Sequence, residues 1–207
     1  TITSKEAWEF LKDKHYSGRK PQITFSFGWY IGNELVAVCT FGKPASPYIC
    51  QGICGKEYSK YVYELNRLCR IDNLSPKDYP LSYFVSQCLK ILKQNYGDFI
   101  IVSYSDTAMN HHGYIYQSLN FLYTGCTKQR TDKYSTGHCR HYDKNIVDKR
   151  VVRSAKYRYI YFCTVYKRVK KEWLKHLKYK VLPYPKGDNS NYVLGEFLKP
   201  TIINVEK

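Results

Sequence analysis

The stretch FIIVSYSDTAMNHHGYIYQSLNFLYTG, residues 99–125, decides the fold of this chain. It opens with an apolar run that ends in Asp106, passes through a polar turn with two histidines and a short helical pattern, and reaches a new apolar strand at Phe121. A strand that ends in a carboxylate, beside imidazoles and a helix start, is how α/β enzymes build a reactive site at the carboxyl edge of a sheet. Asp is also a common turn and N-cap residue, so both interpretations of Asp106 stay open.

The residues before this stretch predict a crossover unit. Residues 61–70 have the pattern of a strand, and residues 81–94 carry the apolar stripe of a helix. With the strand at 99–104 they form a strand–helix–strand unit, whose two strands we expect to be parallel neighbours in one sheet.

Further elements are expected on both sides of this unit. Thr3 begins a capping-box pattern for a first helix, and strict alternation over 22–31 predicts the first strand of a β-hairpin. The Gly-, Pro- and Cys-rich stretch 42–55 is expected to be a loop. Residues 157–166 predict a strand, and residues 168–178 a basic helix. The inward face of that helix is expected to comprise Val169, Trp173, Leu174 and Leu177.

Length and composition indicate a globular protein. The chain has 207 residues, of which 43% are apolar, enough for one well-filled core. We expect a single catalytic domain over residues 1–185, with a basic portion at 126–180, followed by a tail at 186–207. The longest apolar runs are of strand length, and no signal-type segment opens the chain. A cytoplasmic location without a membrane partner is therefore expected.

The eight cysteines do not form the dense pattern of a small secreted scaffold. Free thiols in a reducing compartment are the favoured interpretation. The alternative is a zinc site in which Cys50 and Cys54 join His138 and His141, although its spacing is loose.

Positive charge is concentrated in one part of the chain. The formal net charge is +16, and residues 126–180 hold 17 Lys and Arg side chains against four acids, with tyrosines interleaved. Clustered cations bind phosphates and aromatic rings stack on bases, so a nucleic-acid partner is expected. The expected contacts are Lys128, Arg130, Arg140, Lys149, Arg150, Arg153, Lys156 and Arg158.

The order of the elements matches the GNAT acyltransferase superfamily, whose mixed sheet splays between its central parallel strands. Several motifs then resemble the phage Mom family of DNA-modification proteins, over nearly the whole chain. They are HYSGRKP (15–21), YELNRL (63–68), SYSD (103–106), HHGYIYQSLNFLYTG (111–125) and KYRYIYF (156–162). The resemblance implies a GNAT-like α/β fold with a mixed, splayed central sheet flanked by helices. It also implies an enzyme that places a small carbamoylmethyl group on N6 of adenine in double-stranded phage DNA, which protects that DNA from host restriction endonucleases.

One segment departs from the wider superfamily. GNAT enzymes that use acyl-CoA usually hold its pyrophosphate on a Gly-containing loop after the fourth strand. Here the corresponding IDNLSPKDYPLSY, residues 71–83, contains no glycine, and Pro76 and Pro80 remove amide donors. An acyl-CoA donor is therefore doubtful, the donor stays open, and a metal-assisted reaction with the iron proposed for Mom proteins becomes an alternative.

Asp106 is the first candidate for the chemistry, as a general base or a metal ligand. His15 and Glu64 complete a mixed N/O set that suits non-haem iron or zinc, if the first helix packs over the central strands. His15 is otherwise explained as a cation near a helix C-terminus. Arg67 is expected to pair with a donor phosphate or carboxylate, or with a neighbouring acid.

Aromatic and hydroxyl side chains are expected around this centre. Tyr16, Tyr114 and Tyr116 are candidates to stack on an extruded adenine or to supply a phenol proton, and Tyr116 is preferred because it follows closely after Asp106. The two adjacent histidines cannot both point into one site, and His112 is favoured. Ser17 and Ser103 are expected as hydrogen-bonding neighbours.

Two other function classes remain open. One is an ordinary GNAT N-acetyltransferase that acts on RNA or small amines, which the glycine-free loop argues against. The other is a catalytically inactive nucleic-acid-binding module on a GNAT fold, in which loss of Asp106 would leave the biological effect intact.

Overall fold

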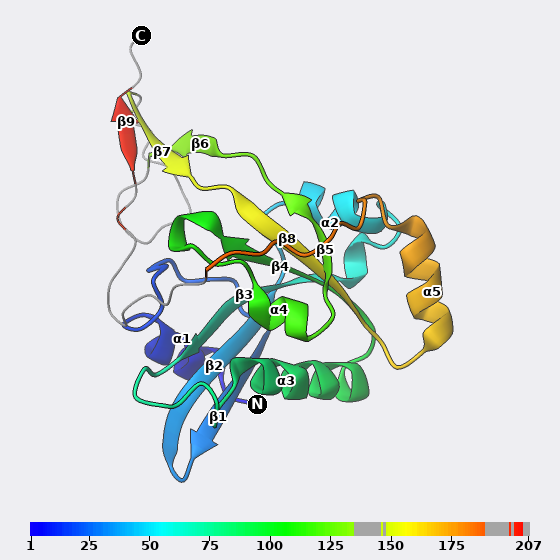
Figure 1. Cartoon of the computed structure of the whole chain (residues 1–207), viewed down its shortest axis with the longest axis horizontal. Coiled ribbons are helices and arrows are strands. Elements are labelled where there is room, and N and C mark those ends of the chain that lie inside the picture. Colours follow the sequence, from blue (N-terminus) through cyan, green and yellow to red (C-terminus); the bar gives the residue numbers. More distant parts are fainter. Residues whose placement is uncertain (135–145, 147, 189–198, 200, 205–207) are drawn as a thin grey trace.

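The centre of the molecule is a six-stranded mixed sheet (Figure 1). The computed structural model describes residues 1–134, 146, 148–188, 199 and 201–204, and all counts of elements refer to these residues. The strand order is β1-β2-β3-β4-β8-β5, and β3 and β4 form the single parallel pair. The strands are β1 (Phe25–Ile31), β2 (Glu34–Gly42), β3 (Val62–Arg70), β4 (Phe99–Asp106), β5 (Leu122–Cys126) and β8 (Lys156–Cys163).

Helices cover both faces of this sheet. On one face, α3 (Leu81–Asn95) and α4 (Tyr114–Ser118) pack on the largest apolar cluster of the described residues. On the other face, α1 (Ser4–Leu11) packs beside β2, while α2 (Pro47–Cys54) and α5 (Lys167–His176) close a separate cluster. Two 3-10 turns, η1 (Ser59–Tyr61) and η2 (Thr107–Met109), directly precede β3 and follow β4.

The two parallel strands separate toward their carboxyl ends. Residues Val62 to Leu65 pair with Ile100 to Ser103, and in the described structure the ladder ends there, although β3 continues to Arg70 and β4 to Asp106. In the described structure the last residues of the two strands are therefore not paired with each other, so the ladder opens at this end. This is the splay expected from the sequence.

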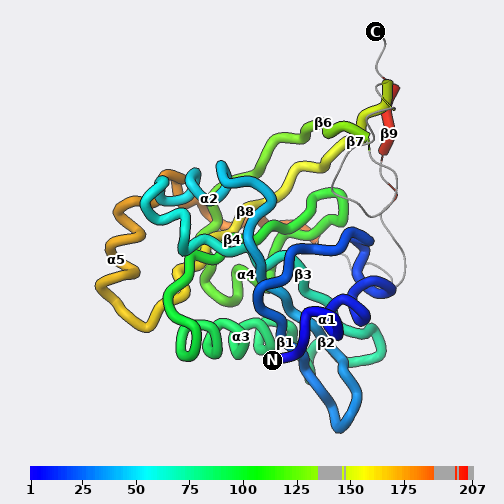
Figure 2. Tube along the Cα trace, turned by 180° about the vertical axis from the view of Figure 1, so that it is seen from behind, coloured from blue at the N-terminus to red at the C-terminus, as the bar shows by residue number. Residues whose placement is uncertain are grey.

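A second, smaller sheet extends the β5–β8 pair beyond the main sheet (Figure 2). It has the order β6-β7-β9, with antiparallel pairing throughout. Its strands are β6 (Arg130–Lys133), β7 (Lys149–Arg153) and β9 (Ile202–Asn204). We call β6 and β7 together the ribbon. Two residues separate β7 from β8, so the ribbon leaves the main sheet next to the end of β4.

Most of the expected elements are confirmed. The strand–helix–strand unit, its parallel strands and the β1–β2 hairpin are present. The seven described cysteines are free thiols. None of the helices among the described residues is long and apolar enough to cross a membrane.

Three expectations at the level of elements need correction or extension. The stretch 42–55 is not all loop, because the Ser46 hydroxyl caps α2 and Pro47 occupies its first turn. Leu174 does not face inward and is 49% exposed. The C-terminal residues also contribute β9 to a sheet, whereas the domain boundary at 185 stays a prediction.

Candidate active site

The candidate site lies at the splay between β3 and β4. Asp106 closes β4, Arg67 lies on β3 past the last paired residue, and the chain after α1 brings His15 and Tyr16 to the same opening. The charge of Asp106 raises the pKa of the Tyr16 phenol, and the charge of Arg67 lowers it. The structure thus brings together four of the side chains that the sequence singled out, from segments up to 91 residues apart in the chain.

Asp106 is a buried carboxylate, 3% exposed. Its Oδ1 accepts hydrogen bonds from the Ala108 amide at 3.0 Å and the Ser154 hydroxyl at 2.5 Å. Its Oδ2 is paired with the ammonium of Lys156, which stands opposite Asp106 in the β4–β8 register. Burial by itself raises the pKa of Asp106, but the hydrogen bonds from Lys156 and Ser154 outweigh it, so the pKa lies below its ordinary value. Asp106 is therefore an anion at neutral pH, and it is also the N-cap of η2.

His15 is buried and neutral. It is 5% exposed, and its Nδ1 accepts the Ser17 amide at 3.0 Å. Burial and the neighbouring Arg67 charge hold the pKa of His15 well below its ordinary value. Because Nδ1 is the acceptor, the proton of the neutral ring is on Nε2. This depressed pKa disfavours the alternative interpretation of His15 as a cation near a helix end.

Tyr16 stacks on His15 with ring centroids 4.4 Å apart. Burial and the nearby Asp106 charge raise the pKa of Tyr16 to about 12. Its phenol is therefore protonated at neutral pH and can donate a hydrogen bond.

Arg67 positions the segment after α1. Its Nη2 donates to the Ser17 hydroxyl at 3.2 Å and to the Arg19 carbonyl at 2.7 Å, and its Nη1 donates to the Asn66 carbonyl at 2.6 Å. These contacts hold residues 17–19 against β3. The Arg67 charge also lowers the pKa of His15 and of Tyr16. The geometry makes Arg67 a positioning residue.

Ser103 and Tyr116 lie at the base of the splay. The Ser103 hydroxyl donates to the Leu65 carbonyl at 3.0 Å, at the last paired position of β3 and β4, and Ser103 is also a hydrogen-bond partner of the Tyr116 phenol. Burial raises the pKa of Tyr116 far above its ordinary value, so this phenol also keeps its proton. Asp106 and Ser103 are separated by three positions on β4, so their side chains leave opposite faces of the strand.

Of the two adjacent histidines, the structure brings His111 to the site. The ring of His111 meets the ring of Tyr16 edge-on, with the centroids 6.1 Å apart. His111 is also one of the groups that lower the pKa of His15. His112 instead stacks on Tyr157 at 5.7 Å, next to Gly187. The sequence predicts that only one of the two histidines enters the site, and the structure decides which one, in a turn where Asn110 and Gly113 are both left-handed.

Tyr114 also lies away from Tyr16. Its phenol donates to the Gly187 carbonyl at 2.5 Å, so it fastens the segment after β8 and α5 onto α4. The sequence predicts Tyr114 in the substrate site, whereas in the structure Tyr114 contacts the C-terminal segment.

The three residues predicted to bind a metal do not form a ligand set in this arrangement. Among the described residues, no group of three His, Cys, Asp or Glu side chains is placed to hold a metal ion. The carboxylate of Asp106 is occupied by Lys156, Ser154 and Ala108, and His15 lies among the positive charges of Arg67 and Lys156, which oppose a second cation. The Glu64 charge raises the pKa of Tyr104, Cys50 and Tyr116. These residues do not fit the iron that the resemblance implies, and the zinc alternative falls partly on His138 and His141, which lie outside the described residues.

The predicted nucleic-acid contacts divide into two groups. Lys128, Arg130 and Lys149 are exposed on or beside the ribbon, Arg150 is half-buried there, and Arg153 pairs with Asp132 at 2.9 Å. Two others have internal partners: Lys156 holds Asp106, and Arg158 bonds to Thr124 at 2.9 Å and covers the Tyr179 ring at 3.5 Å. Arg140 lies outside the described residues.

Lys156 is the site residue whose local role the sequence reasoning missed. It was expected to contact nucleic acid, and its pairing with Asp106 follows from the β4–β8 register across 50 residues of chain. The alternating pattern of β8 was visible in the sequence, but the register of a strand that returns from a distant segment was not.

The chain matches one family model and is weakly similar to solved structures. The model of the Mom protein family matches residues 1–186, and no curated protein matches the chain. Among solved structures, the chain is similar to a probable acetyltransferase from Staphylococcus epidermidis ATCC 12228, with 14% identity, a TM-score of 0.40 and 66% of each chain covered, so it spans just under two thirds of that protein. It is also similar to the Drosophila melanogaster polyamine N-acetyltransferase, with 12% identity, a TM-score of 0.40, and 78% of this chain and 97% of that chain covered. Because the family match spans most of its length, the chain belongs to the Mom protein family.

Proposed function

We propose that this protein is a transferase that attaches a small carbamoylmethyl group to N6 of adenine in double-stranded DNA, and that the modification protects the DNA from restriction endonucleases. Membership of the Mom family supports the reaction class. The observation that carries the assignment is the charged, buried Asp106 at the splay, whose charge acts on the protonated Tyr16, with the neutral His15 stacked on that tyrosine.

The Asp106 carboxylate can receive the proton that N6 must lose. Three donors occupy its two oxygens, and a carboxylate offers about four acceptor positions, so one position remains for an adenine N6–H. Adenine N6 is a weak nucleophile because its lone pair is delocalised into the ring. A carboxylate with a low pKa does not deprotonate neutral adenine beforehand, and it therefore takes the proton as the new bond forms.

The transfer step balances with an alkylating amide donor. The bond between N6 and the methylene carbon of the carbamoylmethyl group forms, and the bond from that carbon to its leaving group breaks. The leaving group departs with the electron pair, and the N6 proton passes to Asp106. Lys156 stabilises the carboxylate before the step, and the Tyr16 phenol is placed to donate to a polar group of adenine or of the donor.

The donor in this proposal is not acyl-CoA. The connection from β3 to α3 contains no glycine. It is held by Arg70, which donates to the Tyr79 carbonyl at 2.5 Å. Pro80 stands at the N-cap of α3 without a side-chain cap. This connection therefore lacks the glycine-rich backbone that cradles a pyrophosphate.

The ribbon is the surface that we assign to the DNA duplex. Its two strands are part of a three-stranded sheet with β9, and Lys133 and Arg150 are directly paired across β6 and β7 and share one face, where cations can contact phosphates. The ribbon joins β8 through Ser154 and Ala155, beside Asp106. A duplex held on the ribbon would therefore lie close to the carboxylate that acts on an extruded base.

Mass spectrometry of nucleosides tests the function directly. DNA from cells that express the protein is expected to contain an adenosine of increased mass, and Asp106→Asn is expected to lower its amount at least 100-fold, within the range for loss of a proton acceptor. The exposed Asp78→Asn is the matched control and is expected to keep full modification. Unmodified nucleosides at full expression of the folded wild-type protein would disprove the proposal, and an acetylated product would identify an ordinary acetyltransferase.

A further inference from the structure

Helix α5 carries the densest group of exposed cations in the described part of the chain. Between Lys167 and Lys180, seven Lys and Arg side chains are exposed, and Glu172 is the one acid. None of these seven was among the residues expected to contact nucleic acid. The seven are Lys167, Arg168, Lys170, Lys171, Lys175, Lys178 and Lys180.

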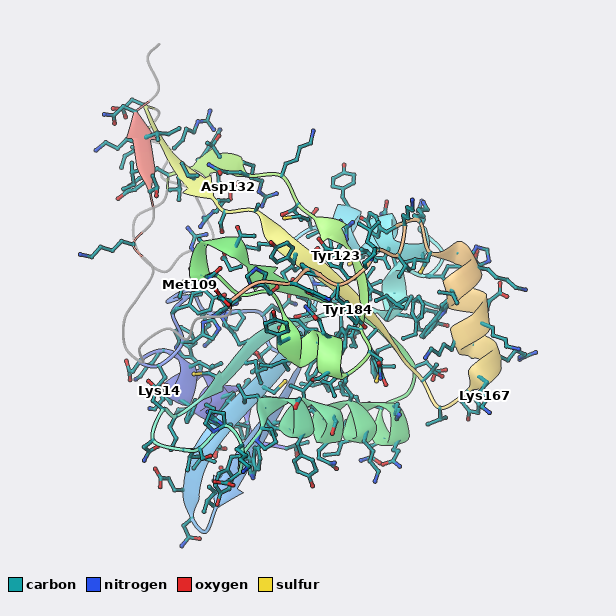
Figure 3. The ribbon with its side chains drawn as sticks, in the orientation of Figure 1. Lys14, Met109, Tyr123, Asp132, Lys167 and Tyr184 are labelled. Carbon is teal, nitrogen blue, oxygen red and sulfur yellow. The ribbon has the colours of Figure 1, made fainter. Side chains whose placement is uncertain are left out.

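The cations lie opposite the face that anchors α5. Trp173 is 2% exposed and packs on Tyr61 and Phe162, with ring centroids 5.5 and 5.9 Å apart. At 100° per residue, Lys171 and Lys175 lie on the side away from Trp173. Lys167 continues the same row one turn earlier, and Figure 3 places it at the N-terminal end of the helix.

The positive charges in the first turn of α5 do not stabilise the helix, although Lys175 and His176 in its last turn do. Its first turn contains no acid and three cations, in a place where the helix dipole disfavours positive charge. Lys167, Lys171 and Lys175 follow one another at i, i+4 spacing, and like charges at this spacing destabilise a helix. Glu172 is engaged by His176 at 2.9 Å and Lys175 at 4.0 Å. The remaining positive charge on the outer row thus opposes folding, and a bound polyanion would neutralise it.

We propose that the outer face of α5 is a second, sequence-independent contact for the phosphate backbone of DNA, separate from the ribbon. The proposal rests on the DNA substrate of the proposed function. Figures 1 and 2 place α5 and the ribbon on opposite sides of the molecule, and Figure 3 shows the same for Lys167 and Asp132. Contacts at α5 therefore add affinity without touching the reacting base.

A nucleic acid fits this face better than an anionic membrane does. A helix that lies in a membrane interface needs an exposed apolar face opposite its cations. The apolar face of α5 is instead occupied by the core, where Trp173 is buried, and the large apolar side chains exposed on or just before α5 are Leu174, Val165 and the N-cap Tyr166. The outer row offers charge without apolar area.

Salt-dependent DNA binding of two matched triple variants tests the proposal. One combines Lys167→Gln, Lys171→Gln and Lys175→Gln, and the control combines Lys5→Gln, Lys77→Gln and Lys90→Gln, which are exposed on other elements. Both lose three positive charges, and Gln is nearly as good a helix former as Lys. Affinity for a duplex is measured by fluorescence anisotropy between 50 and 200 mM salt, a range for which counterion release gives a linear log–log slope.

The α5 variant is expected to reduce that slope by about 2.7, because each lost phosphate contact removes about 0.9, while the control leaves it close to the wild-type value. Equal slopes for the two variants would overturn the proposal. Loss of binding to phosphatidylserine vesicles without loss of DNA binding would also overturn it, in favour of a membrane. Because binding is measured without turnover, a reduced slope together with unmodified cellular DNA would contradict the proposed function and leave the α5 contact standing.

Discussion

At the scale of single residues, the site combines groups whose ordinary charges are changed or fixed by their surroundings. Asp106 stays charged although it is buried, because Lys156 and two further donors hold it. His15 stays neutral because it is buried beside Arg67. Tyr16 keeps its proton because it shares this burial and faces a carboxylate. The site therefore holds one proton acceptor, Asp106, among groups that keep their protons. This arrangement suits a reaction that removes a proton from an amino group.

The buried His15 predicts a specific pH dependence of stability. Below about pH 6.5 the imidazole of the unfolded chain takes up a proton, whereas that of folded His15 does not because its pKa is depressed. The neutral His15 therefore makes its full contribution to the free energy of unfolding above pH 6.5. As the pH decreases below 6.5, this contribution falls by up to about 1.4 kcal/mol per pH unit. His15→Gln lacks this contribution, so its deficit in free energy of unfolding relative to wild type should narrow between pH 7.5 and 5. Urea unfolding at several pH values measures the deficit, and a deficit that stays constant would contradict a neutral buried His15.

At the scale of elements, the short helix α4 depends on the glycine before it. Gly113 has φ +77°, and a Cβ at this position would lie 2.5 Å from the Tyr159 ring and 3.0 Å from the Ser105 hydroxyl. The close approach lets Tyr159 hydrogen-bond to the His112 carbonyl and seats Tyr116 against the sheet. The turn with the two histidines and α4 are thus fixed against β8 by one residue without a side chain.

Gly113→Ala is expected to destabilise the fold more than an equivalent change at Gly97. Both glycines have a positive φ, which costs an alanine about 1–2 kcal/mol, but the space at Gly97 is open. The clash at Gly113 adds about 1–3 kcal/mol as overpacking. Thermal or chemical unfolding of the two variants measures the difference. Equal losses of stability would show that the Tyr159 contact does not constrain this turn.

The elements also show where sequence patterns were sufficient. Strict alternation predicted the β1–β2 hairpin, and the lengths of β3, α3 and β4 predicted a parallel pair. In contrast, α2 was hidden in a stretch rich in Gly, Pro and Cys, because the composition of a short buried helix resembles that of a loop. The spacing assigned Leu174 to the inward face, but Trp173, Val169 and Leu177 are the residues of this segment that pack against the sheet.

At the scale of the whole molecule, the basic excess is distributed over two separate surfaces. One is the ribbon, which joins the main sheet beside Asp106, and the other is the outer row of α5. The first is expected to affect both DNA affinity and the positioning of the target base, and the second to affect affinity alone. Variants of the ribbon should therefore lower both DNA affinity and the rate of modification, whereas variants of α5 should lower DNA affinity alone.

Neutralising Lys133 and Arg150 on the ribbon is expected to lower both duplex affinity and modification of DNA that is already bound. The double variant Lys133→Gln, Arg150→Gln removes two cations from one face, and the salt slope should fall by about 1.8. Single-turnover modification at saturating protein measures the second effect, and the α5 triple variant is the comparison because its single-turnover rate should equal that of wild type. A ribbon variant with a wild-type rate would show that the ribbon contributes charge without placing the base.

The sequence by itself determined the class of fold, the parallel central pair, the concentration of positive charge and the family resemblance. Each of these depends on periodicity, composition or short motifs, which are local properties of a chain. Tertiary structure decided which of the singled-out residues meet: Arg67 with the segment after α1, Asp106 with Lys156, and His111 with Tyr16. It also decided that Glu64, Asp106 and His15 form no ligand set in the described structure. The physical reason is that strand register and the splay of β3 from β4 set these distances, and both result from packing between segments far apart in the chain.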